Sequence, residues 1–443
     1  MTENYNVTEY KMINKLHPNK IPYLLVYDDK GNIFEDKRYY AVGQTGNNTV
    51  ELTPNDFIEL PFGSDLFFLP GRNPIGKNIK TGEIEIIDDK LAVSAFVAPA
   101  YTVTHHAAWK TNENAPRLPL FAYSAVGWLN NKFYVPAIRI ESDIRQDCDQ
   151  FDQKKVISGA KKMLKLKPEN RLVKHLSYCA LEYFCPAARN YFLNRWEAPL
   201  PTSPTCNSQC LGCISYQPKE HKISSTQNRI TFVPTPQEIA EVAIEHLETA
   251  PNPVVSFGQG CEGEPILVWE TLRDAIILIR KKTQKGIINL NTNASNPKAI
   301  DEMCKVGLQS VRVSLNSARE NIYNAYYKPR NYTFSDVLES VKISRKHNIW
   351  ISLNYFVFPG ITDCEEEFNA LTKLLTSYKI NMIQWRNFNI DPEWYIKETG
   401  YNFNSKQLGI KNIIETIKLN YPIVYNGYFN PGKDVIDKFG IVK

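Results

Sequence analysis

The pattern of hydrophobic and polar positions changes near residue 195, and the two parts of the chain predict different structures. In the first part, apolar runs such as 23–27, 91–97 and 132–140 are short and are separated by turn sequences rich in Pro, Gly and Asn. Such runs predict strands. Residues 153–193 are predicted to be helical. We therefore expect an N-terminal accessory domain over residues 1–194, mixed but mostly β and antiparallel, and helical at its end.

From residue 195 onward, strand-like runs alternate with helical segments, which is the pattern of parallel β/α units. One helix is predicted to begin after Thr235, because Thr235-Pro-Gln-Glu238 forms a capping box with proline at the first helical position. The predicted strands cover residues 200–205, 253–257, 287–291, 310–315, 350–358 and 382–386. Six strands with five intervening helices indicate an α/β fold, an open and partial (β/α)6 barrel over residues 195–390. A helical tail is expected over residues 391–443, with a helix from about 404 to 419.

Composition places the chain among globular proteins and limits the kinds of partner that it is expected to bind. Hydrophobic residues make up 43% and charged residues 22% of the 443 positions, as in folded domains. No apolar run approaches the roughly 20 residues that span a bilayer, so we expect no membrane anchor. The N-terminal sequence Met-Thr-Glu-Asn-Tyr-Asn has neither the basic stretch nor the apolar core of a signal peptide, which predicts a cytoplasmic protein. A net charge of +5 is too small, over this length, to favour nucleic acid as a partner.

Three of the nine cysteines are densely spaced. Cys206, Cys210 and Cys213 fall within eight residues, so that one short loop can wrap a metal centre with three thiolates. A structural zinc ion normally has four protein ligands, often from paired Cys-x-x-Cys knuckles, and the sequence has no second knuckle. Three thiolates therefore favour a [4Fe–4S] cluster with one iron open to another ligand. A zinc loop and a chance grouping of buried cysteines are the alternatives.

The other six cysteines lack tight spacing, and we interpret them as ordinary thiols. They are Cys148, Cys179, Cys185, Cys261, Cys304 and Cys364.

The spacing Cys-x-x-x-Cys-x-x-Cys on the loop after a first strand resembles the signature of radical S-adenosylmethionine (SAM) enzymes. The resemblance implies a radical SAM barrel in which the amino and carboxylate groups of SAM bind the open iron. It also implies that the reduced cluster cleaves SAM into methionine and a 5′-deoxyadenosyl radical, with an electron donor such as flavodoxin or ferredoxin.

A glycine-rich loop, Gly258-Gln-Gly-Cys-Glu-Gly-Glu-Pro265, follows the second predicted strand. Its glycines allow backbone atoms to approach a ligand closely, although a tight β–α turn would use them as well. Gly263-Glu264-Pro265 resembles the family's Gly-Glu-Pro motif, one β/α unit after the cysteines. The common form is Gly-Gly-Glu-Pro, and this chain has Glu262 at the first position. The resemblance implies that backbone groups of the loop, from Gly260 to Pro265, and either Glu262 or Glu264 face the ammonium group of the methionine moiety.

Polar residues at the ends of later strands are further candidates for the pocket. Such side chains can bind ribose hydroxyls or a carboxylate, and ordinary capping of β–α turns is the alternative. Arg312 alternates with Ser314 and shares its face, where it can reach a carboxylate or form a structural ion pair. By resemblance, Gln384 and Trp385 stand where the family contacts adenine. The other strand-end candidates for the pocket are Thr292, Asn293 and Asn316.

The leading hypothesis is a radical SAM enzyme that abstracts hydrogen from an unidentified substrate. A peptide or protein substrate is conceivable, because the N-terminal domain could serve as a docking module, whereas nucleic acid is unlikely given the charge. One alternative is a glycyl-radical-type activase, whose substrate is the backbone of a partner protein. Another is a non-catalytic binding protein in which the metal only staples a loop.

Overall fold

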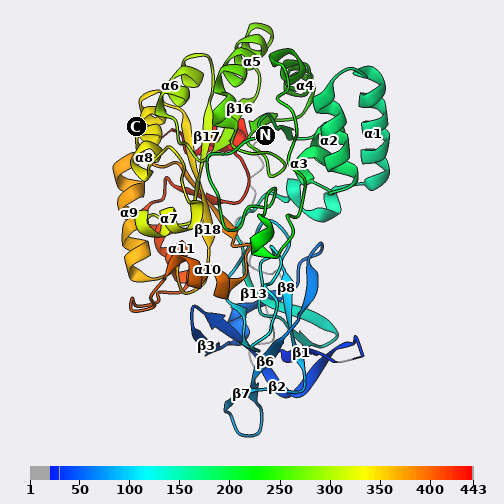
Figure 1. The fold of residues 1–443 in the computed structure, drawn as a ribbon, viewed down its shortest axis with the longest axis vertical. Helices are drawn as coiled ribbons and strands as arrows, with labels where there is room; N and C mark the ends of the chain where they lie inside the picture. Colours follow the sequence, from blue (N-terminus) through cyan, green and yellow to red (C-terminus); the bar gives the residue numbers. More distant parts are fainter. Residues whose placement is uncertain (1–19, 29, 442–443) are drawn as a thin grey trace, which may run out of the picture.

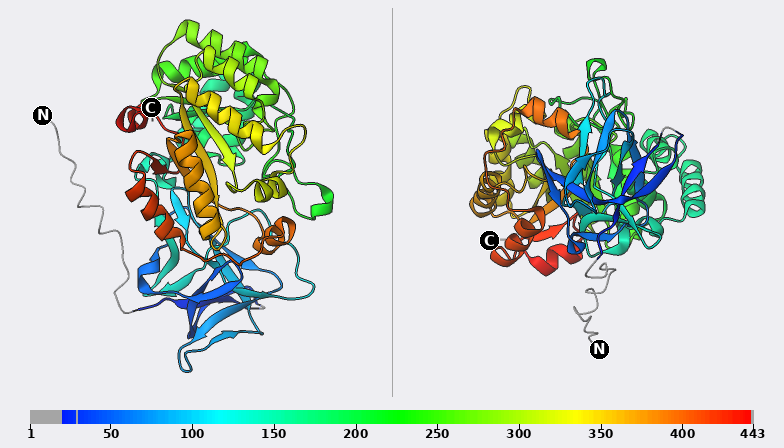
Figure 2. Two further views of the ribbon diagram at one scale, coloured as in Figure 1. Left: turned by 90° about the vertical axis from the view of Figure 1, so that its left-hand side faces the viewer. Right: turned by 90° about the horizontal axis from the view of Figure 1, so that it is seen from below.

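The computed structural model describes residues 20–28 and 30–441. An antiparallel sheet region lies at one end of an elongated molecule, and a parallel sheet with its helices forms the remainder (Figures 1 and 2). The N-terminal sequence on which the expectation of no signal peptide rests lies outside the described residues. Within the described ranges, no helix is long and apolar enough to cross a membrane.

The antiparallel region contains the strands that the N-terminal apolar runs predict. Runs 23–27, 91–97 and 132–140 form β1, β8 and β13, and the buried side chains of Leu25, Val93 and Val135 pack into one hydrophobic cluster between them. The strands are β1 Tyr23–Tyr27, β2 Ile33–Thr45, β3 Asn48–Glu51, β4 Phe57–Glu59, β5 Asp65–Leu69, β6 Arg72–Asn78, β7 Ile84–Ile86, β8 Leu91–Phe96, β9 Tyr101–Val103, β10 His106–Ala107, β11 Trp109–Thr111, β12 Gly127–Leu129 and β13 Lys132–Arg139. All pairings between them are antiparallel.

Three helices connect the two sheets. They are α1 Gln153–Leu166, α2 Arg171–Leu181 and α3 Pro186–Phe192, as the sequence predicts for residues 153–193. Asp152 caps α1 by accepting hydrogen bonds from two backbone N–H groups, and Asn170 caps α2 in the same way through one. Helix α2 contacts α4 of the parallel sheet, and α1 and α3 pack against α2 (Figure 1).

The second sheet is entirely parallel, and it confirms the predicted α/β class. Its strands, in spatial order, are β14 Glu197–Leu200, β15 Val254–Phe257, β16 Ile287–Thr292, β17 Ser310–Leu315, β18 Trp350–Val357, β19 Met382–Asn387 and β20 Tyr425–Gly427. The helices between them are α4 Pro236–Thr249, α5 Trp269–Lys282, α6 Pro297–Lys305, α7 Glu320–Tyr327, α8 Phe334–Lys346 and α9 Glu365–Tyr378. Because all these strands are parallel, their carboxyl ends lie on one edge of the sheet.

Two strands differ from the prediction. The first strand ends at Leu200 instead of spanning 200–205, because Pro201 has no N–H and the next two amides donate to the Glu262 carboxylate instead of to a neighbouring strand. Among the described residues the sheet also has a seventh strand, β20, in place of the predicted six. Its three residues, Tyr425-Asn-Gly427, carry too little apolar pattern to be recognised in a sequence.

The C-terminal segment is less regular than the predicted tail. It contains α10 Pro392–Thr399, which the sequence pattern did not indicate, then α11 Ile410–Asn420, β20 and α12 Lys433–Phe439. The predicted helix over 404–419 begins later, after Gly409, whose φ of +85° is outside the helical region.

The antiparallel region contacts the carboxyl end of β19. Thr102 on β9 donates to the backbone carbonyl of Trp385 at 2.9 Å, and the Asn387 side chain bonds the backbone of Val103 and Tyr101 at 2.8 and 2.9 Å. The N-terminal sheet therefore lies against the edge of the parallel sheet at which ligands of such folds bind.

Candidate active site

The cysteine loop follows the carboxyl end of β14 and is fastened to α7. The side chain of Leu211, between the last two cysteines, is fully buried. Backbone amides of Gln209 and Leu211 donate to the carbonyls of Tyr327 and Tyr326, at 2.9 and 3.1 Å. Gly212 has no room for a side chain, since a Cβ there would lie 2.9 Å from the Tyr326 hydroxyl. These contacts set the loop conformation and leave all three cysteines partly exposed.

Hydrogen-bond donors surround two of the three sulfur atoms. The Ser208 amide lies 3.4 Å from the Sγ of Cys206. The guanidinium of Arg229 and the hydroxyl of Ser215 lie 3.6 and 3.7 Å from the Sγ of Cys213. Donors of this kind stabilise metal-bound thiolates, so they form the outer shell expected around a cluster.

Burial opposes ionisation of the same cysteines. It raises the pKa of Cys206 to about 12 and that of Cys210 well above its ordinary value. Thiolates at these positions therefore need the positive charge of a metal centre, because metal ligands must be deprotonated.

The three thiols of the cysteine loop can serve as ligands of a polynuclear metal centre. In a [4Fe–4S] cluster each cysteine binds a different iron, and the donor set fits such a group.

The glycines of the second loop approach the chain's own backbone. Gly258 has a φ of +80°, and a Cβ there would lie 1.8 Å from the carbonyl oxygen of Asn291. A Cβ on Gly263 would lie 1.9 Å from the carbonyl oxygen of Thr205. The Gly263 and Glu264 amides donate to the carbonyls of Ser203 and Thr205 at 2.6 and 2.7 Å. The glycine-rich loop is therefore packed, backbone against backbone, onto the segment that leads into the cysteine loop.

Gly260 and Pro265 occupy different surroundings within this loop. Gly260 is exposed, and a Cβ on it would meet the Gln227 side chain at 2.4 Å. Pro265 is buried and begins a short 3₁₀ helix, Pro265–Val268, which Glu264 caps.

Both candidate carboxylates are buried and bound to the chain. Glu262 accepts the amides of Thr202, Ser203 and Gln259, at 2.7, 2.9 and 2.6 Å. Glu264 accepts the Ile266 amide at 3.1 Å, together with the two groups on β16 described below. Burial raises the pKa of each carboxyl group to about 7, although the hydrogen bonds act to lower it. Each glutamate joins two segments of the site, and a contact with the methionine ammonium would use the oxygen lone pairs that these bonds leave free.

The carboxyl end of β16 connects the two loops. Thr292 donates to Glu264 at 2.5 Å, and the backbone amide of Asn293 donates to the same carboxylate at 2.8 Å. The Asn293 side chain donates to Asn207 at 2.8 Å and to Ser208 at 3.2 Å, both in the cysteine loop. Three predicted residues, Glu264, Thr292 and Asn293, are thus joined to one another and to Asn207 and Ser208, which the predictions did not include.

The two predicted pocket residues at the end of β17, Ser314 and Asn316, lie in different surroundings. Ser314 is partly buried and stands opposite Asn354 of β18 in the parallel register. Asn316 lies beyond the strand and is buried, and its amide donates to the Ile322 carbonyl at 3.2 Å and the Tyr395 hydroxyl at 3.0 Å. Asn316 therefore fixes α7 and α10 rather than extending the β16 contacts.

Gln384 and Trp385 are both fully buried and point to opposite faces of β19. Gln384 accepts from Arg312 at 3.3 Å and donates to Asn430 at 3.2 Å, inside the barrel. The Trp385 indole donates to Asn426 at 2.8 Å, while its backbone carbonyl accepts the hydroxyl of Thr102. The backbone carbonyl of Trp385 therefore already has one partner from the N-terminal sheet.

Two arginines supply positive charge to the barrel interior. Arg312 on β17 and Arg386 on β19 both reach the Gln384 side-chain oxygen, at 3.3 and 3.4 Å. Among the described residues neither arginine forms an ion pair with a carboxylate, and the Nε of each is buried without a hydrogen-bond partner. Burial, together with the charge of Arg386, lowers the pKa of Arg312 to about 9. The interior is thus suited to an anionic group.

The sequence analysis treated Cys179 and Cys261 as ordinary thiols and did not predict that they lie close together. Cys179 and Cys261 converge on His175, and no motif links these three positions.

Comparison with known proteins gives one family match and several more distant likenesses. Residues 200–371 match the family model described as the Radical SAM superfamily. An uncharacterized protein of Methanocaldococcus jannaschii is 25% identical over 189 residues, which is 42% of this chain, and the match spans about two fifths (41%) of that relative. Among solved structures, Streptococcus suis SuiB bound to S-adenosylmethionine is similar at a TM-score of 0.39 and 13% identity, covering 72% of each chain. A radical SAM methyltransferase from Sphaerobacter thermophilus has a TM-score of 0.33 and 13% identity, covering 46% of this chain and 63% of that one.

The family match includes the cysteine loop, the glycine-rich loop and the end of β16. It supports SAM-dependent radical chemistry in general terms. Residues 200–371 of this chain are thus a domain that matches the Radical SAM superfamily.

Proposed function

We propose that this protein is a radical SAM enzyme that abstracts hydrogen from a substrate bound at the carboxyl edge of the parallel sheet. Cys206, Cys210 and Cys213 would hold a [4Fe–4S] cluster. When bound and reduced, this cluster supplies the electron that cleaves SAM into methionine and a 5′-deoxyadenosyl radical. The glycine-rich loop and the strand ends beside it would hold SAM.

One observation carries the proposal. Asn293 donates through its side chain to Asn207 of the cysteine loop and through its backbone to Glu264 of the glycine-rich loop. The two loops that carry the family motifs are therefore joined to the end of β16, and through it to each other, by hydrogen bonds. Such preorganisation is what a site needs when two ligands must be held in fixed relative positions.

The chain's own residues would orient SAM and exclude water. Backbone groups around Gly260 are exposed and can meet the methionine amino group. Arg312 and Arg386 place positive charge in the barrel interior, and the Nε of each has no hydrogen-bond partner, which suits a carboxylate of SAM or of the substrate. The N-terminal sheet covers the carboxyl end of β19, and a covered site protects a reactive radical from solvent.

The position of the N-terminal region at the rim of the barrel supports a role for this region in substrate selection. Its strand β9 bonds directly to Trp385 and Asn387 at the rim of the barrel. We propose a peptide or protein substrate that docks on this region, and a flavodoxin or ferredoxin as the electron donor.

The proposal is tested with anaerobically purified protein, reconstituted with iron and sulfide and mixed with SAM and a low-potential reductant. We expect about four irons per chain and formation of 5′-deoxyadenosine. Separate changes of Cys206, Cys210 and Cys213 to Ala should abolish both. Cys304→Ala, at a partly buried thiol on α6, should retain both and serves as the matched control.

The alternatives give other results in the same experiment. A metal-stapled binding protein would release no 5′-deoxyadenosine under any reductant, even with its metal fully loaded. A glycyl-radical-type activase would cleave SAM and leave a stable radical on a partner protein, which electron paramagnetic resonance detects. A protein that binds iron in full and still cleaves no SAM would refute the enzymatic proposal.

A further inference from the structure

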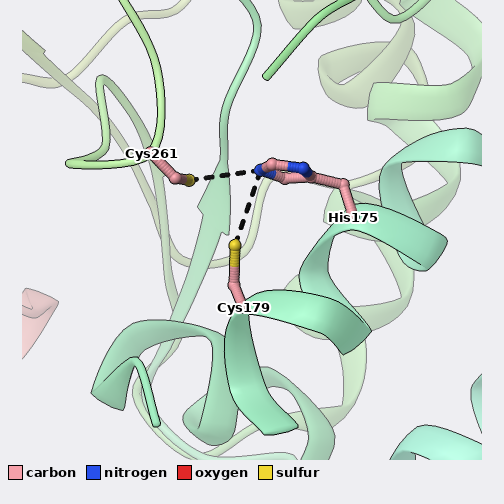
Figure 3. Close-up of side chains that lie close together, drawn as sticks. All are labelled: His175, Cys179 and Cys261. Carbon is pink, nitrogen blue, oxygen red and sulfur yellow. Dashed lines mark hydrogen bonds between the residues drawn. The ribbon is translucent and has the colours of Figure 1, made fainter. Parts of the chain in front are cut away.

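A second group of metal-binding side chains lies outside the cysteine loop. His175 and Cys179 are four residues apart on α2 and therefore share one face of the helix. Cys261 reaches the same point from the glycine-rich loop (Figure 3). The Nε2 of His175 lies 3.3 Å from the Sγ of Cys261 and 3.5 Å from the Sγ of Cys179. The side chains of Cys179 and Cys261 are only 1% and 5% exposed.

Hydrogen bonding alone would not require this convergence. A neutral imidazole nitrogen offers either one lone pair or one N–H, and here two thiols converge on the same nitrogen. A metal ion, in contrast, needs several ligand atoms directed at one point. Tetrahedral zinc with Zn–S of about 2.3 Å and Zn–N of about 2.0–2.1 Å places sulfur and nitrogen about 3.6 Å apart. The observed separations of 3.3 and 3.5 Å are close to that value.

We propose that His175, Cys179 and Cys261 bind one zinc ion. Two thiols and an imidazole are a ligand set that zinc favours, and water would complete the tetrahedron, as in open zinc sites that have three protein ligands instead of the four of a closed structural site. Binding would release the two thiol protons to solvent and form two Zn–S bonds and one Zn–N bond, with no change of oxidation state.

This proposed zinc site differs from the cysteine loop in the number of metal ions it would hold and in the segments it would connect. Its three ligand atoms all lie within 4.8 Å, which is the spacing of a mononuclear site. Cys261 immediately precedes Glu262, whose carboxylate holds the amides of Thr202 and Ser203 before the cysteine loop. The ion would therefore tie α2 to the loop beside the proposed SAM site and stabilise that loop. The inference does not depend on the proposed catalytic function.

Metal analysis of the full chain tests this inference. Protein purified anaerobically from zinc-supplemented cells should contain about one zinc ion per chain in addition to any iron. Cys179→Ala and Cys261→Ala should each lose most of the zinc and keep the iron. Cys206→Ala should do the opposite, while Cys185→Ala, at a neighbouring thiol outside the group, should keep both metals.

Cobalt and thiol labelling remain informative where an alanine variant fails to fold. Co²⁺ added to the zinc-depleted wild-type protein should give the strong visible bands of a tetrahedral site and a thiolate-to-cobalt charge-transfer band. In zinc-loaded wild-type protein, Cys179 and Cys261 should resist alkylation and become reactive after chelation, as peptide mass spectrometry reports. Absence of zinc and of the cobalt spectrum in wild-type protein would overturn the inference. So would a metal-free protein in which these two cysteines form a disulfide.

Discussion

A buried ion pair holds the N-terminal sheet against the segment that follows β19, and its removal should be costly. Arg72 on β6 and Asp391, the N-cap of α10, lie 3.1 Å apart with side chains 2% and 4% exposed. Asp391 also accepts the amides of Leu118, Glu393 and Trp394. Asp391→Ala leaves the Arg72 charge buried without its carboxylate, which should lower the free energy of unfolding by about 3 to 5 kcal/mol. Loss of the helix cap adds about 1 kcal/mol, so we expect a total of about 4 to 6 kcal/mol.

The assay is urea unfolding followed by tryptophan fluorescence, with the wild-type slope used to convert midpoints into free energies. The matched control is Lys77→Met. Lys77 lies on the same strand as Arg72, and its ion-pair partner Glu51 is 56% exposed. An exposed pair contributes less than about 1 kcal/mol. The reasoning fails if Asp391→Ala is destabilised no more than Lys77→Met.

Two further predictions concern the loop packing and pH. Gly263→Ala should separate the glycine-rich loop from the cysteine loop, because its Cβ would meet the Thr205 carbonyl at 1.9 Å. We expect a loss of about 1–3 kcal/mol and of SAM cleavage, measured by thermal unfolding and 5′-deoxyadenosine yield. Gly82→Ala is the control, because its φ of +78° strains an alanine while its Cβ would meet no atom within 4 Å, so it should lose some stability and retain the cleavage. Burial lowers the pKa of His246 to about 4 from 6.5, so the unfolded chain binds the proton more readily between these pH values. Wild-type stability should therefore fall by about 3 kcal/mol from this residue as pH drops from about 6.5 to 4, and His246→Gln should flatten the measured dependence.

Local sequence signals predicted most of the parallel sheet. The apolar run 310–315 became β17 with the same bounds, and the Thr235–Glu238 capping box begins α4. The errors arose where tertiary partners decide the structure. Thr202 gives its amide to Glu262 instead of a strand, and β20 forms because β19 offers it an edge.

The candidate site was predictable as a set of loops but not as a set of contacts. The spacing of the cysteines and the Gly-Glu-Pro sequence identified the correct segments. The sequence did not show that Glu264 binds Asn293, or that Asn207 completes that link. It also gave no sign that His175 and Cys261, 86 positions apart, converge, because sequence separation carries no information about tertiary approach.

The most direct test of the central claim is electron paramagnetic resonance of the reduced, reconstituted protein before and after SAM is added. The account predicts a [4Fe–4S] signal from wild-type protein whose g-values shift when SAM binds the open iron. The signal should be absent from Cys206→Ala, Cys210→Ala and Cys213→Ala. A spectrum that is identical with and without SAM, or a signal that survives loss of these cysteines, would contradict the account.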